Sequence, residues 1–275
     1  MLTDYHVHLR PDERECTAAE HFTAGNVERY RAAAEEQGIQ ELGVAEHIYR
    51  FAAALEVWEH PFWREYAHDD LDAYCGFVRE ETDLRLGIEA DYVPGREDRI
   101  ANLLESRDWD FVVGSVHFLR DRSLDTHDYS IWGGGESAEK IWRRYFETVA
   151  ESALSGLYDV IAHPDLVKVW GESAPRPDKD LRFFYEPAVE AFAEAGVAVE
   201  VSTAGLRKPV AEIYPARPYL EMVLDAGCPI ALSSDAHVPE QVGFRYEEAL
   251  ELLGELGVGE LAVFEGRRRR MEAIG

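Results

Sequence analysis

Residues 2–8 read Leu-Thr-Asp-Tyr-His6-Val-His8, a short run that ends in two histidines spaced by one residue. The run predicts a β-strand over residues 2–6. Because side chains in an extended chain repeat with a period of two, His6 and His8 point to the same face. Two neutral imidazole nitrogens that lie this close can share one metal ion. The opening therefore predicts a strand that carries a pair of metal ligands at its C-terminal end.

Along the rest of the chain, short apolar runs alternate with longer amphipathic stretches, and this pattern predicts alternating strands and helices. The expected strands cover residues 2–6, 42–45, 84–88, 111–113, 158–162, 198–201 and 230–232, with a last apolar run at 261–264. The expected helices cover residues 26–37, 70–81, 96–104, 136–154, 184–195, 219–226 and 245–256. Alternation of strands and helices at this pitch predicts an α/β fold built on a parallel sheet.

Side chains that can bind metal stand at the C-terminal ends of these strands. They are His6, His8, Glu46, His47, Glu89, His117, His163, Glu200, Asp235 and His237. In a parallel barrel the strand ends converge on one rim, where active sites are built. Imidazole and carboxylate ligands together suit zinc, manganese or iron rather than calcium. The pattern therefore predicts a metal centre at the C-terminal rim.

Composition limits the class of protein. The chain has 275 residues, and its 28 basic and 54 acidic residues give a formal net charge of −26. This charge disfavours a nucleic-acid or anionic membrane partner, because such partners need Lys and Arg to neutralise phosphates. Three scattered cysteines and the lack of a signal peptide or a long apolar run indicate a cytoplasmic protein. The economical division is one domain over residues 1–275.

Two further features lie outside the strand ends. Loops rich in Trp, Tyr and Pro follow strands at residues 50–69, 120–135, 171–180 and 207–218, so we expect them on the functional face. A basic tail, Arg267–Arg270, is expected to match the negative C-terminal end of a helix.

The order of the motifs resembles that of the PHP (polymerase and histidinol phosphatase) family, with the strongest likeness to its histidinol-phosphate phosphatase branch. The motifs are Asp-Tyr-His6-Val-His8, Ala-Glu46-His47, Gly-Ile-Glu89-Ala-Asp, Gly-Ser-Val-His117-Phe, Ala-His163-Pro-Asp, Glu200-Val-Ser-Thr-Ala-Gly-Leu-Arg-Lys and Ser-Ser-Asp235-Ala-His237. The resemblance covers essentially the whole chain, and residues 200–242 carry its most specific part. It implies a distorted (β/α)7 TIM-like barrel with the active site at the C-terminal rim.

The resemblance also implies two or three divalent metal ions (Zn, Mn or Fe). His6, His8, Glu89 and Asp235 would hold the first ion. Glu89 would bridge to a second ion, which His117 and His163 also hold, and His47 and His237 would hold a third.

This sequence departs from the family at two positions. The third site usually takes one more ligand, often a His, shortly after the His-x-His pair. Here the chain reads Arg10-Pro-Asp-Glu-Arg-Glu, so either Asp12 or Glu13 substitutes or the third site is weak or empty. Glu46 stands where the family usually has Asp.

The implied activity is hydrolysis of a small phosphomonoester, with L-histidinol phosphate of histidine biosynthesis as the expected substrate. Metal ions lower the pKa of a bound water from 15.7 toward about 7, which makes hydroxide available as the nucleophile at neutral pH. We expect Arg207 and Lys208 to bind the phosphate. Arg207 is also assigned to catalysis, and Glu46 or a metal-bound water is the candidate that protonates the leaving alkoxide.

Three alternatives stay open at this point. An amidohydrolase-type barrel that cleaves a C–N bond also begins with His-x-His, but it usually bridges its metals with a lysine on the fourth strand, and residues 111–117 contain none. A PHP phosphoesterase could act on another small phosphate ester. A non-catalytic binding module would be expected to lose ligands piecemeal, and only one position looks lost. The oligomeric state is left undetermined.

Overall fold

The computed structural model describes residues 1–275 and contains a parallel sheet of seven strands. Their order is β1 (Thr3–Asp4), β2 (Glu41–His47), β3 (Arg85–Asp91), β4 (Phe111–Ser115), β7 (Val160–Ile161), β8 (Ala198–Ser202) and β9 (Ile230–Ser233). Consecutive strands in this order pair in parallel. This arrangement confirms the predicted α/β barrel.

The two outer strands meet just beyond their C-terminal ends. Val7 and Ala236 form an isolated parallel bridge. The amide of His8 donates to the Ala236 carbonyl at 2.7 Å, and the amide of Ala236 donates to the His6 carbonyl at 3.2 Å. The motifs His6-x-His8 and Asp235-x-His237 therefore close the barrel at the rim.

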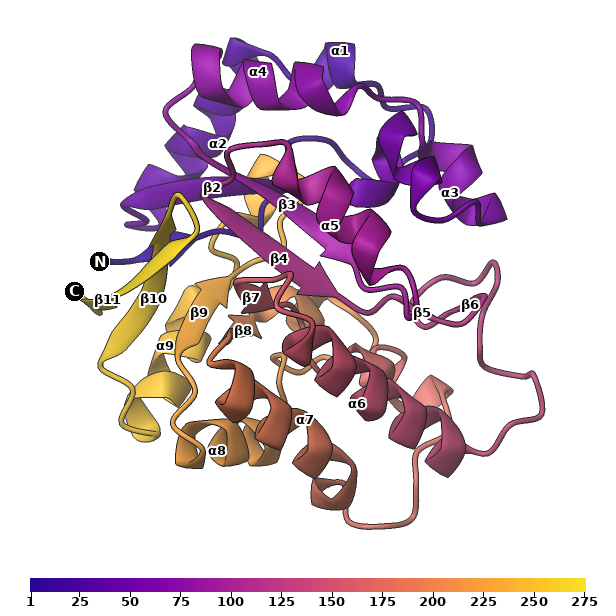
Figure 1. Cartoon of the computed structure of the whole chain (residues 1–275). Helices are drawn as coiled ribbons and strands as arrows, with labels where there is room; N and C mark the ends of the chain where they lie inside the picture. The colour runs from indigo at the N-terminus through magenta and orange to yellow at the C-terminus, as the bar shows by residue number, and fades with distance from the viewer.

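Seven longer helices cover the strands. They are α2 (Ala24–Glu36), α4 (Leu71–Glu81), α5 (Glu97–Glu105), α6 (Ala138–Leu154), α7 (Arg182–Ala195), α8 (Arg217–Asp225) and α9 (Tyr246–Glu255). Each lies where the sequence predicts a helix, with ends that differ by a few residues. The predicted apolar positions Val27, Tyr30 and Ala34 of α2 are buried. Helices α6, α7 and α8 lie side by side along one side of the barrel (Figure 1).

A cluster of three aromatic rings fills the inside of the barrel. Phe111 is fully buried, with its ring centroid 5.0 Å from that of Tyr5 and 6.5 Å from that of Phe264. Glycine lies beside this ring on the two preceding strands, β2 and β3. A Cβ atom on Gly43 would lie 2.8 Å from the Phe111 ring, and one on Gly87 would overlap the same ring. The glycines of β2 and β3 therefore leave space for the aromatic cluster in the barrel interior, below the rim.

The opposite end of the barrel is covered by an antiparallel hairpin of β10 (Glu260–Glu265) and β11 (Arg268–Ala273). It lies beside both chain termini (Figure 1). Ala262, Val263 and Phe264 are buried against the interior residues of the barrel. The hairpin thus separates the barrel core from solvent on the side away from the rim.

The interpretation of Arg267–Arg270 as a helix-end charge match holds for Arg269, which donates to the carbonyl of Gly196 at the C-terminal end of α7, but the segment itself forms a hairpin strand. Gly266 and Arg267 turn the chain with φ values of 54° and 59°, and β11 begins at Arg268. Positive φ at two adjacent turn residues is the geometry of a tight hairpin. The Arg267 guanidinium pairs with Asp159 at 2.8 Å, and Arg270 pairs with Glu272 at 2.8 Å. The arginines are therefore the exposed side of an edge strand.

The remaining elements are short. They are α1 (Ala18–His21), α3 (Pro61–Tyr66), β5 (Phe118–Leu119), β6 (Arg122–Ser123) and the 3₁₀ helices Ile48–Arg50, Ala52–Glu56, Leu166–Lys168, Gly171–Ser173, Thr203–Arg207 and Pro239–Gln241. Most of them belong to the segments that follow strands at the rim. None of the helices is long and apolar enough to span a membrane.

Candidate metal centre

Four ligand atoms from three strand ends surround one point at the rim. The Nε2 atom of His6 lies 3.4 Å from Oε2 of Glu89 and 3.7 Å from Oδ1 of Asp235. The Nε2 atom of His8 lies 3.7 Å and 3.3 Å from the same two oxygens. Ligands of a tetrahedral zinc ion stand about 3.3 Å apart, given metal–ligand bonds of about 2.0–2.2 Å. These four side chains therefore have the spacing of a first metal site.

The second carboxylate oxygen of Glu89 faces another pair of histidines. Its Oε1 atom lies 3.4 Å from Nε2 of His117 and 3.2 Å from Nε2 of His163. His163 adopts a positive φ of 26°, which turns its imidazole into the barrel just after β7. Glu89 thus stands between two groups of nitrogens, the position expected of a bridging carboxylate.

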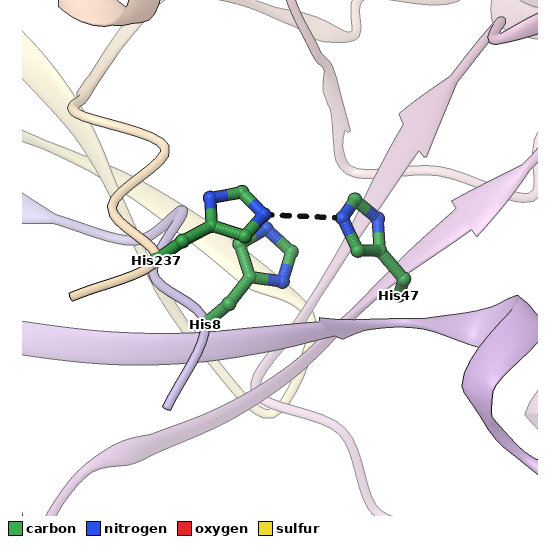
Figure 2. A group of neighbouring side chains, drawn as sticks. All are labelled: His8, His47 and His237. Carbon is green, nitrogen blue, oxygen red and sulfur yellow. Dashed lines mark hydrogen bonds between the residues drawn. The ribbon is translucent and has the colours of Figure 1, made fainter. Parts of the chain in front are cut away.

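A third group lies nearer the solvent. Figure 2 shows His47 and His237 with their nitrogens facing each other, and the two Nε2 atoms are 3.3 Å apart. His8 stacks against both rings, with centroid distances of 4.2 Å to each. The Asp12 carboxylate lies beside the same nitrogens, 3.5 Å from His47 and 3.0 Å from His237. Asp12 therefore occupies the position for which the sequence left Asp12 and Glu13 as alternatives.

Many ligand atoms in these groups have no hydrogen-bond partner in the protein. They are Nε2 of His6, both ring nitrogens of His8 and Oδ1 of Asp235, while Nδ1 of His47 and Oε2 of Glu89 pair with each other. Buried polar atoms are normally paired, because an unpaired one costs about 1–3 kcal/mol. Converging, unpaired nitrogens and carboxylate oxygens fit divalent metal ions, which replace several hydrogen bonds at once.

The charges of the cluster lead to the same conclusion. Burial raises the pKa of the Glu89 carboxyl, but the surrounding histidines overcome burial and hold the pKa well below its usual range. Burial lowers the pKa of His47, yet the Glu89 and Asp12 carboxylates together outweigh burial and raise the pKa to about 9. The site therefore attracts positive charge, and metal ions compete with protons for it.

Outer carboxylates orient the ligand histidines. Oε1 of Glu200 lies 2.7 Å from Nδ1 of His6, and Oδ1 of Asp91 lies 2.8 Å from Nδ1 of His117. Such carboxylate–histidine pairs fix the tautomer that leaves Nε2 free for metal. Glu200 is among the predicted strand-end ligands, whereas Asp91 was not predicted. Its signal was the spacing Glu89-x-Asp91, which places both residues on one face of β3.

Glu46 does not reach the centre of the site. The side chain is fully buried, and its Oε1 atom accepts hydrogen bonds from the amides of Leu9 and Arg10 at 2.7 and 3.2 Å. Its other oxygen pairs with the buried Arg50 guanidinium. Both oxygens are thus occupied, and Glu46 does not border the pocket. The structure contradicts the prediction that Glu46 protonates a leaving group, and assigns it to holding the His8 segment.

Arg207 and Lys208 are separated by the structure. Arg207 donates from Nη2 to the carbonyls of Ser234 and Asp235 at 2.9 and 2.8 Å, and it does not border the pocket. Arg207 holds the loop that carries Asp235. The position of Arg207 therefore does not support the predicted contact with phosphate. Lys208 is exposed and borders the pocket, where its ammonium can meet an anion.

The metal-ligand groups open into a cavity of about 210 Å³. Its floor includes Asp12, His47, His117, His163, Asp235 and His237. Its walls include the aromatic residues Tyr49, Phe62, Tyr66, Phe118, Trp170 and Tyr214, together with Asp125, Thr126 and Lys208. A small ligand that binds here lies directly on the ligand groups.

Substitution of Asp12 by asparagine tests the third group. We expect metal affinity at this group to fall at least about 10-fold, because a charged ligand becomes neutral. The first two groups keep all their ligands, so the tightly bound metal should remain. Metal titration of the purified variant measures the loss. Glu13→Gln is the control, because Glu13 lies in the same loop and its side chain accepts a hydrogen bond from Cys16, at 3.9 Å, and not from a ligand histidine. Equal affinities in the two variants would exclude Asp12 as a ligand.

Comparisons with known proteins agree with this geometry. The family model described as PHP domain matches residues 17–204. A protein from Deinococcus radiodurans named probable histidinol-phosphatase is 33% identical over 255 residues, covering 90% of this chain and 93% of the relative. The histidinol-phosphatase of Bacillus subtilis is 29% identical over 188 residues, covering 63% of this chain and 70% of its own.

A solved structure has the same fold. It is a histidinol phosphate phosphatase from Lactococcus lactis, described as a complex with zinc, L-histidinol and phosphate. It superposes with a TM-score of 0.72 at 19% identity and covers 98% of both chains. The family match over most of the chain and the similarity to the Deinococcus protein confirm the resemblance seen in the motifs: the chain belongs to the PHP domain family.

Proposed function

We propose that the chain is a metal-dependent phosphatase that hydrolyses L-histidinol phosphate to histidinol and phosphate. The observation that carries the proposal is the convergence of three groups of His, Asp and Glu ligand atoms, several of them unpaired, at the floor of one small pocket. The relatives that the chain matches over most of its length are named histidinol-phosphatases. We assign the activity to one domain over residues 1–275.

The ligand set assigns the roles of individual residues. His6, His8, Glu89 and Asp235 would hold one ion, Glu89 with His117 and His163 a second, and His47 and His237 with Asp12 a third. When bound, divalent ions polarise the phosphoryl group and make hydroxide available at neutral pH. Glu200 and Asp91 keep the histidines in the tautomer that binds metal. Arg207 fixes the Asp235 loop, and Lys208 attracts the phosphate at the pocket mouth.

The pocket walls suit the rest of histidinol phosphate. The ring of Tyr49 packs edge-on against Phe62 at 5.2 Å, and Phe62 packs against Phe118 at 5.5 Å. Aromatic faces of this kind bind a flat imidazole through dispersion and offset or edge-to-face packing. A pocket lined by apolar rings with a few convergent polar groups is typical of small-molecule sites.

The amidohydrolase alternative expected a lysine among the metal ligands. The strand β4 contains no lysine, and Lys208 lies at the mouth rather than the floor. The buried Lys168 pairs with Asp165 at 3.0 Å and Glu212 at 3.1 Å and does not border the pocket. The phosphatase assignment therefore accounts for the site, and the amidohydrolase assignment does not.

A substrate panel tests the proposal. The metal-loaded protein is assayed for phosphate release from histidinol phosphate, sugar phosphates, nucleoside monophosphates and p-nitrophenyl phosphate. We expect kcat/KM for histidinol phosphate to exceed that of every other ester by at least about 10-fold, because only this substrate fills both the metal floor and the aromatic walls. A stronger preference for another ester would contradict the substrate assignment, and no release from any ester would contradict the phosphatase.

A further inference from the structure

Three acidic residues border the pocket, and two of them are committed to the metal centre. Asp12 faces His47 and His237 and pairs with Arg50 at 2.6 Å. Asp235 faces His6 and His8. Asp125 is the remaining acid, and no lysine, arginine or histidine forms an ion pair with it. One half-buried negative charge in the pocket therefore has no positive partner in the protein.

Asp125 is held in place by its own loop. The buried Ser123 hydroxyl donates to Oδ1 of Asp125 at 2.9 Å and accepts from the amides of Asp125 and Thr126 at 3.3 and 3.1 Å. Only Oδ1 is used in this turn, so Oδ2 is available to a ligand. The loop segment is fixed at both ends, because the amide of Ser123 donates to Tyr129 and the amide of Ile131 donates to Ser123, both at 2.8 Å.

The same loop is bonded directly to the metal centre. The amide of Leu124, the residue before Asp125, donates to the carbonyl of the ligand His117 at 2.9 Å. The Leu124 carbonyl accepts from the indole of Trp170 at 2.7 Å, which joins it to the aromatic wall. Asp125 is therefore preorganised between the ligand groups and the wall, so little ordering entropy is lost when it binds a group there.

The pocket contains groups that attract anions and one carboxylate, Asp125, that attracts cations. The ligand groups and Lys208 attract the phosphate of a substrate. A free carboxylate beside them repels a purely anionic ester, because like charges in a partly desolvated pocket are unfavourable. A substrate that carries an amine near its phosphate satisfies both charges. In histidinol phosphate the amine is on the carbon next to the one that bears the ester oxygen.

We propose that Asp125 binds the ammonium group of the substrate and thereby selects amino phosphate esters over esters without an amine. This inference rests on the proposed phosphatase activity and adds the residue that determines specificity. The carboxylate forms a charged hydrogen bond with the ammonium, while Ser123 keeps the carboxylate facing the pocket. Asp125 contacts the substrate but takes no part in bond breaking.

The test compares Asp125→Asn with the wild type on two substrates. One is histidinol phosphate, and the other is the imidazolylpropyl phosphate that differs only in lacking the amine. Asparagine keeps the oxygen that accepts from Ser123, so the turn is preserved and only the charge is removed. We expect kcat/KM for histidinol phosphate to fall about 10- to 100-fold, the range of a charged hydrogen bond, and kcat/KM for the amine-free ester to change less than about 3-fold.

The control is Asp128→Asn, which changes an exposed acid of the same loop that does not border the pocket. We expect it to behave like the wild type on both substrates. Equal losses on both substrates in Asp125→Asn would overturn the proposal, because they would show that Asp125 only supports the His117 segment. No loss on either substrate would overturn it as well.

Failure of the proposed activity on histidinol phosphate gives a different result from failure of the proposed role of Asp125. If the wild type releases phosphate from other esters but not from histidinol phosphate, the substrate assignment fails while the role of Asp125 is still tested by phosphoethanolamine against ethyl phosphate. A loss confined to phosphoethanolamine supports the amine contact, and an equal effect on both esters contradicts it.

Discussion

Replacing Glu89 with glutamine should lower kcat/KM for phosphate release by about 10³-fold or more. Glu89 is fully buried and offers one carboxylate oxygen to His6 and His8 and the other to His117 and His163. A neutral amide keeps the volume but removes the charge that two ligand groups share. Removal of a single preorganised electrostatic group already costs about 10²–10³-fold in kcat, and here two metal positions are lost together.

Metal content and steady-state kinetics measure this effect. The variant should bind fewer metal equivalents than the wild type and should not recover activity at high metal concentration. Glu105→Gln is the matched control, because Glu105 is exposed at the C-terminal end of α5 and is not among the ligand groups. Near-normal turnover of Glu89→Gln would contradict the assignment of Glu89 as the bridging ligand.

Replacing Phe111 with alanine should lower the free energy of unfolding by about 3–5 kcal/mol, the usual cost of emptying an aromatic site in a core. The ring lies between Tyr5 and Phe264 inside the barrel and is fully buried. Urea denaturation of the two proteins measures the difference. Phe183→Ala is the control, because Phe183 is 47% exposed on α7, and we expect its cost to stay below about 1 kcal/mol.

A second substitution tests whether the lack of a side chain at Gly87 is needed to accommodate the Phe111 ring. Gly87→Ala should destabilise the wild type, because its Cβ atom overlaps Phe111. The same change in the Phe111→Ala background should cost clearly less, because the ring is gone. Equal costs in both backgrounds would show that Gly87 and Phe111 are energetically independent.

Much of the fold was predictable because its signals are local. Each strand is an apolar run followed by a ligand, and each helix repeats its apolar positions at helical spacing, so the order of elements follows from the chain itself. The third ligand group required the structure, because Asp12 and Glu13 are adjacent in sequence and only the path of their loop brings Asp12 to His47 and His237.

The predictions for Glu46 and Arg207 failed because they depend on the direction in which each side chain points. Neighbouring residues of a strand point to opposite faces. His47 faces into the barrel beside Glu89, its partner in register on β3, so Glu46 must face away from the pocket. That alternation was available in the sequence and was overlooked. Arg207 is different: its contact with the Ser234 and Asp235 carbonyls joins residues far apart in the chain, and no local pattern predicts it.

The hairpin at the C-terminus was missed for a related reason. The apolar run Leu261–Phe264 was recognised as strand-like, but the arginines after it have no apolar alternation because β11 is exposed on the edge. The available signal was Gly266, which begins the turn with positive φ. The role of the turn at Gly266 follows from the structure, in which Phe264 packs against Tyr5 and Phe111.

The most direct test of the central claim is the metal content of the purified protein, measured together with phosphate release from histidinol phosphate before and after chelation. We expect two to three divalent ions per chain, loss of phosphate release when they are removed, and its recovery when manganese, zinc or iron is returned. Phosphate release that persists in the metal-free protein, or a protein that binds no metal, would contradict the central claim.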